Sequence, residues 1–174
     1  AGFQLALGSA NAAVATVTPT GLAVTGAITS TSIKFGSGTV LSTYEEGTWT
    51  AAATATITPP TVIQTGIGVY TKIGRQVTAT CSSLNSVSMV GSVGNLKITG
   101  LPFTSSSSTG NGAMGSCVLF NIDTPAGAVT LSAWLGNGDN FVQFFATVDN
   151  TIYQLVTDNS TVAGRIWFTV TYFV

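Results

Sequence analysis

The last ten residues of the chain, 165–174, read RIWFTVTYFV. Because successive side chains of a β-strand point to opposite faces, this stretch would have one wholly apolar face and one face that combines aromatic residues with threonine. The first face holds Ile166, Phe168, Val170, Tyr172 and Val174, and the second holds Trp167, Thr169, Thr171 and Phe173. A strand with apolar residues on both faces is typical of the centre of a sheet, or of a surface that contacts another subunit.

Short apolar runs of the same kind recur upstream, from about Ser42. They cover residues 47–57, 67–73, 75–82, 94–99, 114–121, 128–135 and 140–147. Clusters of Gly, Pro, Asn, Asp and Ser separate them at spacings of roughly 8–15 residues, which is typical of a sandwich or barrel. Long helical periodicity is absent. We therefore expect an all-β fold, with an antiparallel, jelly-roll-like β-sandwich head over residues 42–174.

Residues 1–41 have a different composition. Between residues 14 and 40, thinly spaced apolar side chains stand among Thr, Ser and Gly, with no aromatic residue before Phe35. Such a stretch cannot build a core of its own, so we expect residues 1–41 to form an intertwined β shaft or stem that packs between the subunits of a homotrimer. The Ala- and Leu-rich run at 3–15, FQLALGSANAAVA, is the only plausible helix.

The composition excludes several classes of function. The 174 residues include five Lys/Arg, six Asp/Glu and no His, for a net charge of −1. The chain therefore lacks the cluster of basic residues that nucleic-acid binding requires. It also has no run of 18 apolar residues that would predict a membrane span. Without His, neither a Ser-His-Asp nor a Cys-His arrangement can form, and Cys81 and Cys117 are too few ligands for zinc. We expect both cysteines to be small buried hydrophobes, and we expect no catalysis, metal or cofactor.

The one pair of adjacent acids, Glu45 and Glu46, lies in STYEEGTWTA at 42–51. On a strand their side chains would point to opposite faces, so they are poorly placed to act together on one glycosidic bond. We expect one of them to form an ion pair with Lys72 or Arg75, in the same or a neighbouring subunit. Such a pair would fix the register of the paired segments more than it would add to the stability of the fold. A solvated turn and a catalytic pair are the alternatives.

Three motifs follow one another along the chain: YEEGTWT at 44–50, YTKIGRQV at 70–77 and LKITGLPF at 96–103. In this order they resemble the C-terminal module of many bacteriophage and prophage tail-fibre or tailspike proteins. The resemblance covers roughly residues 39–104, and GLAVTGAITSTS at 21–32 looks like the end of the fibre shaft that commonly precedes the module. The family usually continues the first motif with a proline, where this chain has Ala51.

The resemblance implies a homotrimeric tip of a viral adhesion fibre. Upstream fibre or other tail proteins would attach this tip to the virion. Such a tip binds a host surface receptor, often a polysaccharide. In this setting Tyr44, Trp49 and Tyr70 would be structural residues, with Tyr44 and Trp49 packed where shaft meets head. Two alternatives remain open: a tailspike that depolymerises polysaccharide, using two of Asp123, Asp139, Asp149 and Asp158, and a purely structural trimerisation or capping module.

Receptor contacts are expected where aromatic rings and polar side chains share a loop, because sugar recognition combines the two. One group is Trp134, Asn137, Asp139, Asn140 and Phe141, and a second is Tyr153, Asp158 and Asn159. The Ser-rich loop at 105–112 is a further candidate. The side-chain oxygens of the first group are of the type that calcium prefers, but calcium sites generally use more than one carboxylate. We therefore expect a hairpin turn there.

Overall fold

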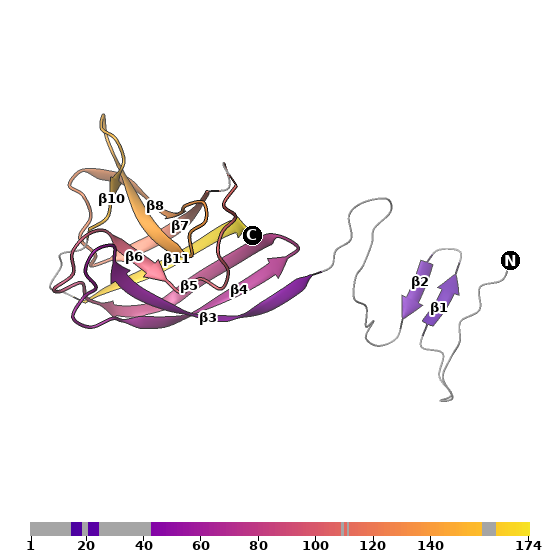
Figure 1. Ribbon diagram of the computed structural model, residues 1–174. Helices are drawn as coiled ribbons and strands as arrows, with labels where there is room; N and C mark the ends of the chain where they lie inside the picture. The colour runs from indigo at the N-terminus through magenta and orange to yellow at the C-terminus, as the bar shows by residue number, and fades with distance from the viewer. Residues whose placement is uncertain (1–14, 19–20, 25–42, 109, 111, 158–162) are drawn as a thin grey trace. The chain divides into compact units, whose positions relative to one another are not determined.

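The computed structural model describes residues 15–18, 21–24, 43–108, 110, 112–157 and 163–174 (Figure 1). The chain divides into two compact units, Ala1–Ser42 and Thr43–Val174. In the first unit, β1 (Ala15–Thr18) pairs antiparallel with β2 (Gly21–Val24). Most of the predicted shaft, and the predicted helix at 3–15 up to Val14, lie outside the described residues.

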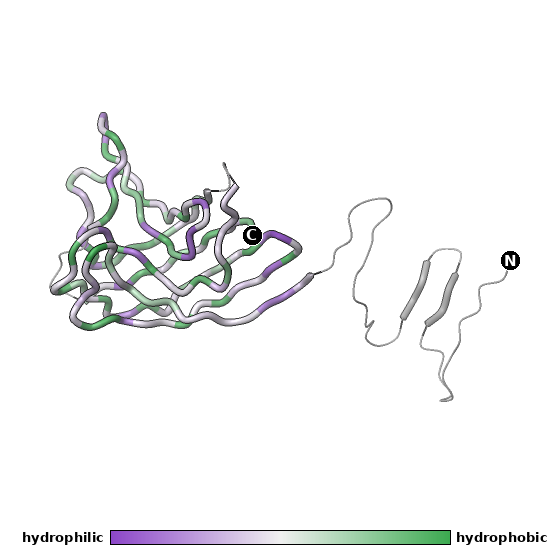
Figure 2. The backbone as a smooth tube through the Cα atoms, in the orientation of Figure 1, coloured by the Kyte–Doolittle hydropathy of each residue, from purple (hydrophilic) through white to green (hydrophobic). Residues whose placement is uncertain are grey.

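The second unit is built from strands, which confirms the all-β prediction. They are β3 (Tyr44–Ala55), β4 (Thr65–Ile73), β5 (Gln76–Val87), β6 (Leu96–Thr99), β7 (Ala113–Phe120), β8 (Ala128–Leu135), β9 (Phe141–Val148), β10 (Gln154–Leu155) and β11 (Gly164–Phe173). No described residue belongs to a helix, and so the described chain has no helix with the length and hydropathy of a membrane span. Hydrophobic residues occur in every part of this unit, and one of the few strongly hydrophilic stretches begins β3 (Figure 2).

The predicted jelly-roll sandwich is wrong, because the strands form one closed sheet. Their order is β10-β9-β6-β3-β4-β5-β11-β7-β8, and β8 also pairs with β9, with Leu131 opposite Ala146. Eight strands thus close into an antiparallel barrel, while β10 pairs with β9 beyond the end of β6. Sandwiches and barrels share the same alternation of buried and exposed residues, so the strand pattern cannot separate them. Closure depends on pairing between the two edge strands.

β11 has a paired strand on each side, as its two-faced pattern predicts. It is hydrogen-bonded to β5 on one side and to β7 on the other. Its inner side chains, from Ile166 to Tyr172, are at most 3% exposed, whereas Trp167 and Phe173 on the outer face are 42% and 46% exposed. The outer face is therefore apolar without being part of the barrel core.

The barrel interior combines a few large rings with small side chains. Phe168 has edge-to-face contacts with Trp49 and Phe144, at centroid distances of 6.1 and 5.9 Å. Cys81 and Cys117 lie opposite Phe168 on the two neighbouring strands, and both are free thiols. Burial raises the pKa of Cys117 to about 11, so this thiol stays protonated at neutral pH. Cys81 is buried as expected, whereas Cys117 is only partly buried and packs against the core.

A glycine on β4 makes room for the largest side chain of the core. Gly68 lies opposite Trp49 in the β3–β4 register, and a Cβ atom at Gly68 would overlap the indole ring. The indole nitrogen of Trp49 donates a hydrogen bond to the carbonyl of Val69 at 3.4 Å. Trp49 therefore lies flat across the neighbouring strand, and only a residue without a side chain fits beneath it.

Gly68→Ala should lower the free energy of unfolding by about 2 kcal/mol, because overpacking a filled core forces side chains and backbone to shift. Urea unfolding followed by tryptophan fluorescence measures the change. The control is Thr48→Ala at an exposed position of β3, where the cost should stay below about 1 kcal/mol. Equal stabilities of the two variants would contradict the close contact between Gly68 and Trp49.

Candidate functional site

The three sequence motifs meet at one end of the barrel. The Tyr70 hydroxyl donates a hydrogen bond to Oε1 of Glu45 at 2.5 Å, which links the first two motifs. The ring of Tyr70 packs edge-on against Phe103 of the third motif, with centroids 5.4 Å apart. The Lys72 ammonium lies 5.5 Å from the centroid of the same Phe103 ring. Residues far apart in sequence thus form one polar and aromatic cluster at this end.

The glutamates have tyrosine partners within the chain. The register places Glu45 opposite Lys72, but the Glu45 carboxylate accepts its hydrogen bond from Tyr70. Glu46 accepts a hydrogen bond from Tyr44 at 2.9 Å. Hydrogen bonding to these carboxylates raises the pKa of both phenols. Pairing of a glutamate with Lys72 or Arg75 of a neighbouring subunit stays a prediction.

Arg75 has a different role, since its Nε donates to the carbonyl of the C-terminal residue, Val174, at 2.9 Å. The backbone amide of Val174 donates in turn to the Arg75 carbonyl. The neighbouring amide of Gly74 donates to the carbonyl of Thr43, the first described residue of this unit. The β4–β5 turn therefore ties together the point where the chain enters the barrel and the point where it ends.

Two of the loops predicted to contact a receptor, the Ser-rich loop at 105–112 and the β8–β9 loop, lie at this same end, whereas the segment that holds Tyr153 follows β9 at the other end. Ser105 is 3% exposed, and its hydroxyl donates to the Gly136 carbonyl at 2.6 Å and accepts from the Asp139 amide at 3.1 Å. The amide of Ser106 donates to the carbonyl of Phe173. The loop that follows β6 and the loop between β8 and β9 are therefore joined, beside the C-terminus. The opposite end of the barrel carries the loops at 56–64, 88–95 and 121–127.

The β8–β9 loop has the geometry of a turn. Gly138 has a φ of +75°, the left-handed region that glycine enters freely. Asn137 and Asn140 are exposed in this loop, while Asp139 is half-buried and bonded through its backbone to Ser105. In the described part of the chain, no group of three or more His, Cys, Asp and Glu side chains lies close enough to hold a metal ion.

An aromatic stack crosses the outer side of β8 and β9. Trp134 stacks on Phe145 with centroids 4.9 Å apart and an interplanar angle of 18°. Phe145 contacts Tyr153, which precedes β10, at 4.5 Å and 30°. All three rings face outward, and Tyr153 is 60% exposed. Trp134 and Tyr153, expected in separate loops, thus belong to one surface that we call the aromatic platform: Trp134, Phe145 and Tyr153.

Phe145 is a residue that the sequence reasoning missed. The signal was the pair Phe144-Phe145 inside a predicted strand, because adjacent strand residues point to opposite faces and one of the two rings must face outward. Phe144 is fully buried in the core, which leaves Phe145 outside. Of the other receptor candidates, Phe141 begins β9 beside the platform, and Asp158 and Asn159 lie outside the described residues.

Two polar residues that the sequence analysis did not single out adjoin the platform. Gln143 on β9 lies opposite Trp134 of β8 on one side and opposite Lys97 of β6 on the other. The Lys97 ammonium lies 5.1 Å from the centroid of the Phe141 ring. A row of cation, amide and indole therefore runs across three hydrogen-bonded strands.

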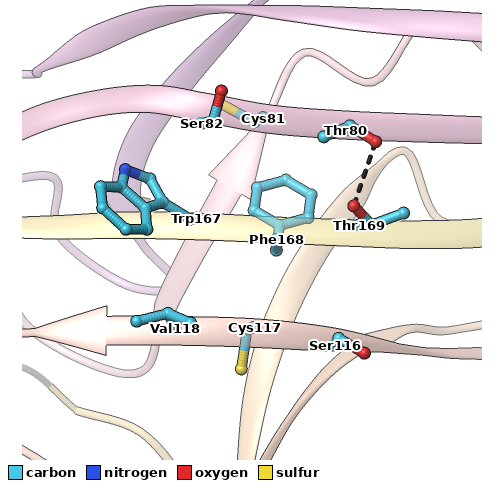
Figure 3. Close-up of a pocket in the computed structure, with 9 residues that line it drawn as sticks. All are labelled: Thr80, Cys81, Ser82, Ser116, Cys117, Val118, Trp167, Phe168 and Thr169. Carbon is cyan, nitrogen blue, oxygen red and sulfur yellow. Dashed lines mark hydrogen bonds between the residues drawn. The ribbon is translucent and has the colours of Figure 1, made fainter.

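A second outward surface lies on β4, β5, β11 and β7. We call it the apolar outer face, and its exposed large side chains are Ile67, Val69, Ile73, Met114, Val118, Phe120, Trp167 and Phe173. Between them, threonine hydroxyls pair across β5 and β11, with Thr80 and Thr169 3.1 Å apart. A shallow hollow of about 210 Å³ lies between Ser82, Val118 and Trp167 (Figure 3). Exposed apolar patches of this extent are typical of interaction surfaces.

Comparisons with known proteins return no relative. No protein-family model, curated protein or solved structure matches this chain. The likeness of the three motifs to tail-fibre modules therefore stays a prediction that rests on the residues quoted for it.

Tyr172→Phe should change how stability depends on alkaline pH. The Tyr172 hydroxyl donates to the Phe103 carbonyl at 3.0 Å, and burial raises the pKa of this phenol from 10.0 to about 12. A raised pKa favours the neutral phenol in the folded state, so its contribution is complete below pH 10 and is lost between pH 10 and 12. The variant should lose about 1 kcal/mol at pH 8 and should fall less steeply above pH 10.

Urea unfolding at pH 8 and at pH 11 measures both effects. Tyr153→Phe is the control, because it removes the hydroxyl of a ring that is 60% exposed, whereas Tyr172 is buried. An alkaline decline of the same steepness in wild type and Tyr172→Phe would contradict the role of the buried phenol.

Proposed function

We propose that this chain is the head of a viral tail fibre, which acts as a homotrimer and attaches the virion to its host by binding a surface glycan. The observation that carries the proposal is the outward-facing aromatic platform, with ring centroids 4.9 and 4.5 Å apart along it. In this proposal the chain acts by binding, and upstream fibre or other tail proteins hold it on the virion.

Stacked rings on a sheet suit a sugar chain for two reasons. Sugar rings have apolar C–H faces that pack on aromatic rings, while their hydroxyls need hydrogen-bonding groups at the rim, a combination that Tyr and Trp provide at adhesive surfaces. The platform residues Trp134 and Phe145 stand on paired strands, so their positions are set before the ligand arrives. A preorganised surface loses little conformational entropy on binding.

The apolar outer face supports self-association. Arg165 is the one charged side chain on the outward positions of β4, β5, β7 and β11 in the described chain, and eight large apolar residues are exposed there. Three copies that bury this face would present three platforms, and a repetitive host surface would then be held by avidity although each site is weak. The same face favours a second candidate function, a structural trimerisation module without a receptor of its own.

Trp134→Ala and Tyr153→Ala should each weaken glycan binding about tenfold, because each variant removes a ring from the platform. The measurement is binding of the purified protein to an array of bacterial capsule and lipopolysaccharide glycans. Tyr44→Ala is the matched control, since Tyr44 is 65% exposed and Tyr153 60%. If no glycan is retained, or if Tyr44→Ala weakens binding as much as Tyr153→Ala, the platform is not a receptor site.

Light scattering should give the mass of three chains, and Val118→Glu should reduce it to that of one. Val118 lies on the apolar outer face and is 55% exposed, so a carboxylate there would be buried without a partner in the trimer. Val129→Glu, at a 68% exposed valine of β8 outside this face, should leave the trimer intact. A monomeric wild type, or equal dissociation of both variants, would contradict assembly through this face.

A further inference from the structure

Lys97 has no counter-charge on the strands around the aromatic platform. β6, β8, β9 and β10 contain no other charged residue. The Lys97 ammonium contacts the Phe141 ring, and within the described chain it has no carboxylate partner. In a chain with only five Lys/Arg in all, one cation is thus placed beside a surface of rings.

Gln143 carries a buried side-chain amide. Its neighbours Val142 and Phe144 point into the core, so Gln143 stands on the outer face, yet it is only 7% exposed. Among the residues that the structure describes, its side-chain amide has no hydrogen bond. Buried amides are almost always hydrogen-bonded, to protein, water or ligand, because removing them from water without a partner is unfavourable. Within the described chain, both N–H donors and the carbonyl acceptor of this amide are therefore unused.

The two residues form a line with the platform. Lys97 is opposite Gln143, and Gln143 is opposite Trp134, so the line crosses β6, β9 and β8. Adjacent strands are about 4.8 Å apart, which puts Lys97 and Trp134 about 10 Å apart along the sheet. This is the length of a disaccharide, with a cation at one end, an amide in the middle and an aromatic ring at the other.

We infer that the glycan is acidic and carries a carboxylate, as uronic and sialic acid residues do. The inference rests on the proposed function and identifies the ligand class of the same site. The carboxylate pairs with the Lys97 ammonium, hydroxyls of the glycan bond to the Gln143 amide, and a sugar ring lies on Trp134. One ammonium with an amide beside it matches the single charge of a carboxylate, whereas phosphate sites generally use several cations or backbone N–H groups.

The test uses uronic- and sialic-acid-containing bacterial oligosaccharides, each beside its carboxyl-reduced counterpart, in which the acid has become a neutral alcohol. Phosphate-bearing oligosaccharides form a third set. Binding is measured for wild type, Lys97→Gln, Trp134→Ala and Lys72→Gln. Lys72 is the matched control, because its ammonium also lies over a phenylalanine ring, that of Phe103, at the end of the barrel. Thermal melting confirms that each variant is folded.

Wild type should bind at least one carboxylate form about tenfold more tightly than its reduced form, with a preference that weakens as salt rises. Lys97→Gln should lose this preference while retaining the reduced form, Lys72→Gln should keep it, and Trp134→Ala should weaken both forms. Equal binding of the acidic and reduced forms through Trp134, or a preference for the phosphate set, overturns the inference and leaves glycan binding in place. Absence of binding to every set overturns the proposed function together with the inference.

Discussion

The pairing of β8 with β9 joins the two ends of the sheet, and the rest of the structure depends on it. Each of the eight barrel strands then has a hydrogen-bonded strand on both sides, and among the described strands of this unit only β10 pairs on one side alone. Closure of this kind removes the free edge strands that could pair with other chains. In a chain with 6% charged residues this matters, because charged residues on edge strands are a usual protection against aggregation.

Closure also decides which residues are inside. The core rings Phe168 and Phe144 are in contact in the interior. The indole of Trp49 contacts Phe168 and lies against Gly68 of β4, which has no side chain to displace it.

Closure leaves the outer side of the barrel with two surfaces of different chemistry. On β4, β5, β11 and β7, large apolar side chains and paired threonines offer area with almost no charge. On β6, β8 and β9, stacked rings stand beside a cation and a buried amide. In the proposed function, the first surface is the subunit interface and the second is the glycan site. Because different strands carry them, one chain could contact its copies and a receptor at the same time.

The motif cluster at the end of the barrel has a structural role of its own. Glu45, Tyr70, Lys72 and Phe103 connect β3, β4 and the segment after β6 by a hydrogen bond, an edge-to-face contact and a cation–π contact. Arg75 and Val174 fasten the C-terminus beside it. The two adjacent glutamates accept hydrogen bonds from different tyrosines, Glu45 from Tyr70 and Glu46 from Tyr44. As neighbours on a strand, their side chains point to opposite sides of β3.

The sequence by itself determined the strand content and the pairing of RIWFTVTYFV on both of its sides, because alternation and turn residues are local properties. It also indicated Trp134, Phe141 and Tyr153 as surface aromatics. Whether the sheet was a sandwich or a barrel depended on pairing between β8 and β9, a contact that alternation does not encode. For the same reason only the tertiary structure could join Trp134 to Tyr153 through Phe145, or bring Lys97 beside Gln143. Register across strands from distant parts of the chain decides such neighbours, and it is set by closure of the whole barrel.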